Sequence, residues 1–296
     1  MTEMIQPQPI TITAADGQRL SAYLFEPRQP NGMSVQINGA TGVPARYYAP
    51  FSQHLAQRGF TVLTFDFRGI ASSPRSEGAP PPRMLDWGVK DVPAASAWLR
   101  RNRPGLQRCI VAHSFGGQVL GLIPEADEIA AAVTIGSQHG YWRNWSMPHR
   151  LYLPFWWYVM VPGLAAATGR LPGLFVGGNP LPEGVARDWA RFCRSRHYLI
   201  DDNGRPLRPY NDRVRARMRL ISFSDDPVYG PARGVDALAG FYPNAKIERL
   251  HVAPSDWGLQ RIGHFGFFKR GMPVERWDEV ANWLQQAAAN RNEKAA

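Results

Sequence analysis

The chain has 296 residues, 44% of them hydrophobic and 20% charged, as is usual for a globular protein with a sizeable core. Its two cysteines, Cys109 and Cys193, stand far apart, so we expect neither a disulfide framework nor a metal site. The net charge is +10, but residues 141–220 carry 13 Arg against five acidic residues. A nucleic-acid-binding surface would spread its charge more widely, so we expect no nucleic-acid partner. The N-terminus lacks the basic and apolar regions of a signal peptide, which predicts a cytoplasmic protein.

Apolar and helical patterns alternate along most of the chain. Apolar runs predict strands at residues 9–14, 20–25, 33–37, 60–65, 107–112, 128–135, 217–223 and 246–252. Helical spacing predicts helices at residues 46–58, 86–101, 115–123, 232–239 and 274–289, with the regular part of the second beginning at Pro93.

Strands that alternate with helices predict right-handed crossovers and a mostly parallel sheet. In such a sheet the reacting groups lie at the carboxyl ends of the strands. Residues 140–212 interrupt the alternation and carry many aromatic and arginine side chains. We therefore expect an α/β core formed by residues 1–139 and 213–296, with an insertion at 140–212.

Residues 110–117 read IVAHSFGG and place Ser114 directly after a predicted buried strand. A nucleophilic serine on a tight strand-turn-helix elbow requires small residues two positions before and two after it. Ala112 and Gly116 meet this requirement, and the backbone N–H of Phe115 can face the same space. The pattern favours a catalytic nucleophile over an ordinary turn that contains serine.

A serine hydroxyl becomes an effective nucleophile only when a base takes its proton and a third group orients that base. His264 lies in the loop between the last predicted strand and the last helix, where an imidazole can reach a nucleophile on a neighbouring strand. His251 lies inside a predicted strand, and His113, next to Ser114, is expected to pack beneath the turn. His264 is therefore the predicted base.

The predicted acid follows the strand at 217–223, where the chain reads Ser224-Asp225-Asp226-Pro227. Either carboxylate can face the histidine. We predict Asp226, while Asp225 stays open as the acid or as a turn and capping residue. Asp66 is a rival at the end of an earlier strand, but Arg68 follows it and can pair with it.

These segments resemble the alpha/beta-hydrolase superfamily, and most closely predicted hydrolases of its serine-aminopeptidase and monoglyceride-lipase-like branch. The resemblance implies an alpha/beta-hydrolase fold, a mostly parallel eight-stranded sheet flanked by helices with an inserted cap over the active site. It also implies an oxyanion hole formed by the backbone N–H groups of Ala40 and Phe115. The residues that carry the resemblance are Asn38-Gly39-Ala40, Asp66-Phe67-Arg68-Gly69, Ser114, Asp225-Asp226-Pro227 and Gly263-His264-Phe265.

The insertion contains an apolar stretch at residues 151–168 that is about as long as the shortest membrane span. Pro154, Pro162 and Gly163 interrupt it, so we expect no membrane span. Three interpretations stay open: a helix packed on the core, an apolar wall for an acyl or aromatic group, and a peripheral lipid contact. The predicted substrate-binding side chains are Trp142, Trp145, Trp156, Trp157 and Tyr229.

Arg187, Arg191 and Arg194 have the spacing of one helix face, which is either solvated or able to bind an anionic group of the substrate or acidic lipid headgroups. No nucleotide, flavin or metal motif is present, so we predict no cofactor. The sequence thus predicts a serine hydrolase that cleaves a carboxylic ester, or a thioester or amide, of a small molecule with an apolar or aromatic acyl part. The alternatives are an acyltransferase that uses the same triad and a non-catalytic ligand-binding protein on this scaffold.

Overall fold

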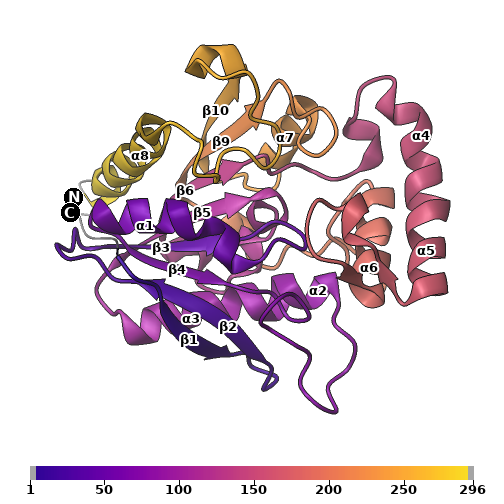
Figure 1. Ribbon diagram of the computed structural model, residues 1–296, viewed down its shortest axis with the longest axis horizontal. Coiled ribbons are helices and arrows are strands. Elements are labelled where there is room, and N and C mark those ends of the chain that lie inside the picture. The colour runs from indigo at the N-terminus through magenta and orange to yellow at the C-terminus, as the bar shows by residue number, and fades with distance from the viewer. Residues whose placement is uncertain (1–4, 293–296) are drawn as a thin grey trace.

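A computed structural model describes residues 5–292, and its centre is an eight-stranded sheet (Figure 1). The strand order is β1-β2-β4-β3-β5-β6-β9-β10. β1 and β2 are antiparallel to each other, β2 is antiparallel to β4, and the other neighbours pair in parallel. The bounds are β1 Gln8–Thr13, β2 Arg19–Phe25, β3 Met33–Asn38, β4 Thr61–Phe65, β5 Gln107–His113, β6 Ile129–Ile135, β9 Arg217–Phe223 and β10 Lys246–Val252.

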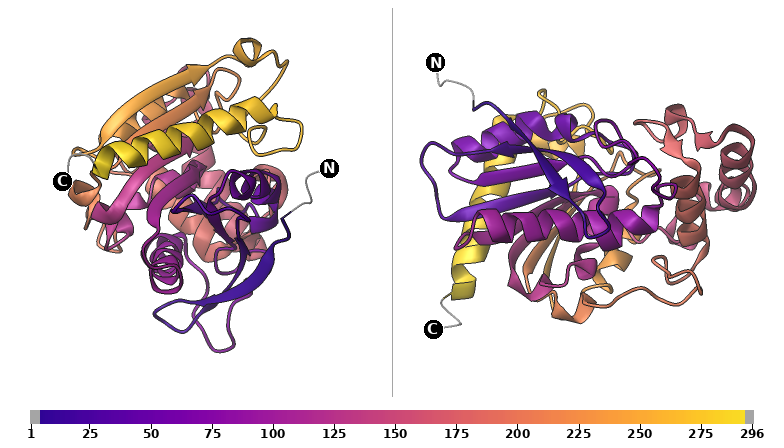
Figure 2. Two further views of the ribbon diagram at one scale, coloured as in Figure 1. Left: turned by 90° about the vertical axis from the view of Figure 1, so that its left-hand side faces the viewer. Right: turned by 90° about the horizontal axis from the view of Figure 1, so that it is seen from below.

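Helices cover both faces of the sheet, as the almost completely buried central strands β3, β4, β5 and β6 require. α1 (Ala49–Gln57) and α8 (Val274–Asn292) share one apolar cluster with the sheet, while α3 (Val92–Asn102) and α7 (Ala232–Ala239) contribute to the other (Figure 2). The predicted fold class is confirmed, and each predicted strand matches its observed bounds within one residue.

The helix predicted at residues 115–123 is wrong. The chain instead makes two short 3₁₀ turns, Ser114–Gly117 and Leu120–Leu122. Glycine is a poor helix former, and here it allows close packing: a Cβ on Gly121 would lie 2.1 Å from Asn211 Oδ1. The predicted helix at 86–101 also divides, into a short α2 (Met84–Asp86), a π-helical segment (Trp87–Asp91) and α3.

The insert, residues 140–212, forms a separate helical layer beyond the carboxyl ends of the strands (Figure 1). α4 (His149–Phe155), a π-helical segment (Trp156–Met160) and α5 (Val161–Thr168) follow one another directly. A two-residue strand pair, β7 (Arg170–Leu171) and β8 (Leu181–Pro182), leads into α6 (Glu183–Arg194). No helix within residues 5–292 combines the length and the apolar character needed to cross a membrane.

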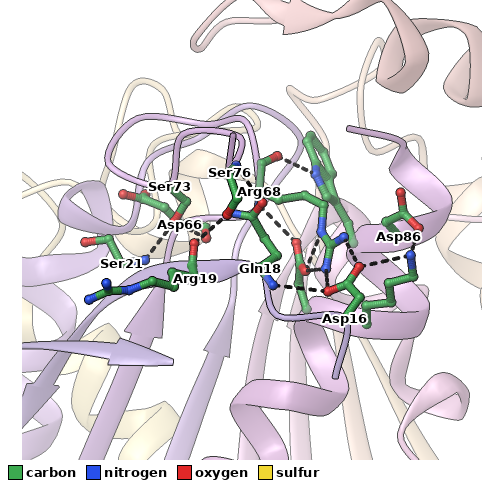
Figure 3. A network of polar contacts seen from close by, with 12 residues as sticks. Asp16, Gln18, Arg19, Ser21, Asp66, Arg68, Ser73, Ser76 and Asp86 are labelled. Carbon is green, nitrogen blue, oxygen red and sulfur yellow. Dashed lines mark hydrogen bonds and ion pairs between the residues drawn. The ribbon is translucent and has the colours of Figure 1, made fainter. Parts of the chain in front are cut away.

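The loop after β4 is held by a network of ion pairs and hydrogen bonds around the buried side chain of Arg68 (Figure 3). The buried guanidinium of Arg68 donates from Nε to Asp91 (2.8 Å) and from Nη1 to Asp16 (2.7 Å). The hydrogen bond from Arg68, together with one from Lys90, holds the pKa of Asp16 well below its ordinary value. Asp66 does not pair with Arg68, which corrects that interpretation: its carboxylate accepts the N–H of Ala45 at 2.6 Å and ties down the loop after β3.

The insert is attached to the core by Asp188 of α6, whose side chain is 6% exposed. Its carboxylate accepts two hydrogen bonds from Arg83, at 2.9 and 3.2 Å, and one from the Leu85 N–H at 3.1 Å. Arg83 also pairs with Asp202, whose side chain is 64% exposed. The two carboxylates thus share one arginine but differ in burial.

This difference predicts unequal effects on stability. Asp188→Ala should lower the free energy of unfolding by about 2–3 kcal/mol, because it leaves the partly buried Leu85 N–H and part of the Arg83 guanidinium without their acceptor. Asp202→Ala, the matched control at the same arginine, should cost at most about 1 kcal/mol. Urea unfolding followed by tryptophan fluorescence measures both, and equal losses would contradict the assignment of Asp188 as the anchor.

Candidate active site

Ser114 stands at the carboxyl end of β5 with a φ of +52°. A residue other than glycine is strained at such a positive φ, and it keeps this conformation only where the surrounding structure enforces it. The packing around the turn requires glycine at the two positions after Phe115. A Cβ on Gly116 would lie 2.2 Å from the Asn38 carbonyl oxygen, and a Cβ on Gly117 would lie 2.3 Å from Ser137 Oγ. The segment therefore has the strained backbone and close packing of a nucleophile elbow.

His264 and Asp226 form a buried hydrogen-bonded pair beside this elbow. The Nδ1 atom of His264 lies 2.6 Å from Oδ2 of Asp226, and both side chains are at most 4% exposed. Because a carboxylate only accepts hydrogen bonds, Nδ1 carries the proton, and Nε2 of the neutral ring keeps a lone pair. The second carboxylate oxygen accepts the Tyr229 N–H at 3.2 Å. The pair can thus act as an oriented base.

Asp225 points to a different part of the same loop. One of its carboxylate oxygens accepts the backbone N–H groups of Ile262 and Gly263, at 2.8 and 2.9 Å. Of the two carboxylates that the sequence left open, Asp226 therefore contacts the imidazole, and Asp225 holds the backbone immediately before His264.

Two glycines outside the predicted site make room for the pair. Gly136, directly after β6, has a φ of +60°, and a Cβ on it would lie 3.1 Å from His264 Nδ1. A Cβ on Gly230 would lie 2.5 Å from Oδ2 of Asp226. Sequence reasoning missed both. For Gly136 the available signal was a glycine at the carboxyl end of a predicted strand.

The three predicted triad residues follow strands of one part of the sheet: Ser114 follows β5, Asp226 follows β9, and His264 lies in the loop after β10, with β6 between β5 and β9. Within residues 5–292 no hydrogen bond joins the Ser114 hydroxyl to the His264 ring. Catalytic hydrogen bonds are often long in unliganded sites and shorten when substrate binds. His113 packs beneath the turn, fully buried, and its Nε2 lies 2.9 Å from the His264 carbonyl oxygen. His251 instead contacts Ser222 (2.8 Å), in the neighbouring strand β9.

The two predicted oxyanion donors differ in the structure. The Phe115 N–H belongs to the first turn of the helical segment Ser114–Gly117, where backbone N–H groups lack a partner within the helix. The Ala40 N–H donates to the buried Tyr48 hydroxyl at 2.8 Å. In this conformation its hydrogen is therefore not free for a substrate oxygen, which corrects the expectation that both amides face the substrate.

A cavity of about 280 Å³ is lined mainly by the insert, together with Gln138, Val228 and Tyr229. Tyr229 is the link to the predicted triad, because it lines the cavity and its ring centroid is 5.2 Å from that of His264. Among the residues that the structure describes, no charged residue and no predicted triad residue lines the cavity. The lining residues from the insert are Trp145, Tyr152, Leu153, Trp156, Trp157, Leu174, Phe175, Trp189 and Cys193.

Four of the five side chains predicted to bind substrate therefore line this cavity, and Trp142 does not. The Trp142 ring packs against Tyr141 and the Arg143 guanidinium and borders a separate surface depression. The sequence alone could not show whether a tryptophan early in the insert faces the cavity or the surface.

The arginines of α6 have partners within the insert. Arg187 pairs with Glu183 at 2.7 Å, and Arg191 donates to the Asp201 carbonyl oxygen at 2.8 Å. Arg194 donates to the Ala190 carbonyl oxygen, and its guanidinium lies over the Tyr158 ring. These contacts favour a structural role over the binding of an anionic substrate group.

Comparison with known proteins is consistent with this geometry. The profile of the alpha/beta hydrolase family matches residues 37–283. Similar solved structures include a soluble variant of monoglyceride lipase from Saccharomyces cerevisiae in complex with a substrate analogue, at 15% identity and a TM-score of 0.67, covering 97% of each chain. An esterase from Pyrococcus furiosus shows 18% identity and a TM-score of 0.59, covering 95% of this chain and 91% of its own. No curated protein sequence matches significantly.

Proposed function

Since the chain belongs to the alpha/beta hydrolase family, we propose that this esterase- or lipase-like enzyme cleaves a carboxylic ester through a triad of Ser114, His264 and Asp226. The observation that carries the proposal is the 2.6 Å contact between His264 Nδ1 and Asp226, beside a serine held at a φ of +52°. A thioester or an amide has the same reacting carbonyl and fits the same chemistry.

In the proposed reaction, Nε2 of His264 takes the proton of the Ser114 hydroxyl while Oγ attacks the carbonyl carbon. The tetrahedral intermediate expels the alcohol, which receives that proton, and Ser114 is left acylated. Water then attacks the acyl-enzyme while His264 again takes the proton. The bond between the acyl carbon and Ser114 Oγ breaks, Oγ receives that proton from His264, and the acid is released. Asp226 holds the tautomer and stabilises the positive imidazolium at each step.

The Phe115 N–H is the oxyanion donor that the structure supports best. Ala40 can contribute only if its N–H shares its hydrogen between the Tyr48 hydroxyl and the substrate oxygen. Removing one such donor from a comparable site lowers kcat by about 10²–10³-fold.

Labelling with a fluorophosphonate probe tests the nucleophile. The native enzyme should react covalently at Ser114, and Ser114→Ala should not, because the probe requires an activated serine hydroxyl. Ser137→Ala removes another buried serine nearby and should label like the native enzyme. Equal labelling of native enzyme and Ser114→Ala would overturn the assignment, and absence of labelling from the native enzyme would favour a non-catalytic binding protein.

For the substrate we propose a neutral, apolar or aromatic acyl part seated in the aromatic cavity. An unpaired carboxylate is costly to bury, and no charged side chain lines this space. The tested pair is p-nitrophenyl butyrate and p-nitrophenyl hemisuccinate, which have equal acyl length and differ in charge. We expect kcat/KM for the butyrate to be larger by about tenfold or more, as a desolvation cost above about 1.4 kcal/mol implies. Equal values would contradict a neutral binding site.

The outer surface of the insert supports a proposed peripheral lipid contact. Leu151 is 69% exposed, Phe155 58% and Leu174 89%, and Met147, Tyr158 and Val159 are also exposed. Exposed apolar clusters of this kind mark interaction surfaces, and the exposed Arg150 beside them suits an anionic headgroup.

Co-sedimentation with vesicles of phosphatidylglycerol and phosphatidylcholine tests this contact. Replacing both Leu151 and Phe155 by serine should reduce the bound fraction severalfold, because less apolar surface enters the interface. Val274→Ser is the control, since Val274 is 49% exposed and belongs to α8, a helix that lies across the molecule from α4 (Figure 1). Unchanged binding of the double variant, or no binding of the native enzyme, would contradict the proposal.

A further inference from the structure

A continuous chain of buried hydrogen bonds runs beneath the elbow and does not include the triad side chains. The Ala40 N–H lies 2.8 Å from the Tyr48 hydroxyl, which lies 3.0 Å from Nδ1 of His113. Nε2 of His113 lies 2.9 Å from the carbonyl oxygen of His264. The chain therefore joins the loop after β3, the end of β5 and the loop that carries the base.

The donor and the acceptor of each hydrogen bond in this series can be assigned by starting from the two ends of the series. The His264 carbonyl oxygen only accepts, so Nε2 of His113 carries a proton. Burial keeps the pKa of His113 well below its ordinary value, so the ring is neutral and Nδ1 is an acceptor. The Tyr48 hydroxyl must then donate to Nδ1 and accept the Ala40 N–H. Burial raises the pKa of Tyr48, so this hydroxyl keeps its proton.

The packing around Tyr48 leaves it little freedom. Its ring is buried, with its centroid 4.9 Å from that of Phe268. A Cβ on Gly39 would lie 3.2 Å from the same ring, so the loop after β3 passes directly over it. The Tyr48 hydroxyl is thus held at one position between Ala40 and His113.

We propose that Tyr48 and His113 are positioning residues that fix the backbone of His264 and the amide of Ala40 relative to Ser114. His113 precedes Ser114 in the chain, so its bond to the His264 carbonyl ties the base directly to the nucleophile elbow. Asp225 holds the backbone on the other side of His264, through the Ile262 and Gly263 N–H groups. The inference rests on the proposed hydrolase function.

Kinetics of the variants His113→Phe and Tyr48→Phe test the proposal. Each interrupts the chain without removing a triad group, so His264 should lose alignment with Ser114. We expect kcat per titrated active site to fall by about 10- to 100-fold for His113→Phe, the scale of a misplacement of about 1 Å, while KM changes less than about twofold. Tyr48→Phe should lose less, and the double variant no more than His113→Phe, because both changes break one unit.

Ser52→Ala is the matched control. Its buried hydroxyl donates to the Tyr48 backbone carbonyl at 2.9 Å and lies outside the chain, so kcat should stay at the native value. Counting active sites with the fluorophosphonate probe separates a lower rate from a smaller folded fraction. Native kcat in both His113→Phe and Tyr48→Phe, or additive losses in the double variant, would overturn the inference and would leave the proposed triad unaffected. Failure of the native enzyme to label would instead overturn the proposed function.

Nitrogen NMR of the native enzyme labelled in histidine tests the same inference without any substitution. The His113 ring should be neutral at pH 7, with its proton on Nε2. A proton on Nδ1, or a charged ring, would be incompatible with the donors and acceptors assigned to these hydrogen bonds and would overturn the proposal.

Discussion

The buried hydrogen bond between His264 and Asp226 explains most features of the structure around it. A 2.6 Å hydrogen bond to a carboxylate fixes the tautomer of the ring and directs its lone pair away from the acid. The contact is possible because Gly136 and Gly230 lack side chains, since a Cβ at either position would press against the pair. The sheet supplies the remaining constraint, because the strands before Ser114, Gly136 and Asp226 are neighbours in a parallel array.

Neighbouring polar residues in this site have separate roles, although they are adjacent in sequence. Asp225 holds backbone N–H groups, whereas Asp226 contacts the imidazole. His113 contacts the backbone carbonyl of His264, whereas Ser114 presents the hydroxyl. In both pairs, consecutive residues make different contacts: one holds backbone groups of a loop, and the other is the residue proposed to take part in the reaction.

The sheet could be predicted from the sequence, because buried parallel strands are continuous apolar runs. The elbow could be predicted as well, because its steric requirements restrict the residue types around Ser114. The sequence also predicts Ser114, Asp226 and His264 as a triad, because each lies in a segment that follows a predicted strand, and that prediction is the one proposed above. It could not predict the partner of the Ala40 N–H, because Tyr48 and His113 meet only through packing of separate elements. The helix predicted after Ser114 was wrong for a related reason: Gly116, Gly117 and Gly121 serve close tertiary contacts that local helical spacing does not reveal.

The crystal structure of the enzyme after reaction with a fluorophosphonate tests the central claim most directly. We predict phosphorus bonded to Ser114 Oγ, His264 Nε2 within hydrogen-bonding distance of the adduct, and one phosphonyl oxygen at the Phe115 N–H. We also predict that Nδ1 of His264 stays hydrogen-bonded to Asp226. A phosphonylated Ser114 with the His264 ring turned away, or the adduct on another residue, would contradict the proposed triad.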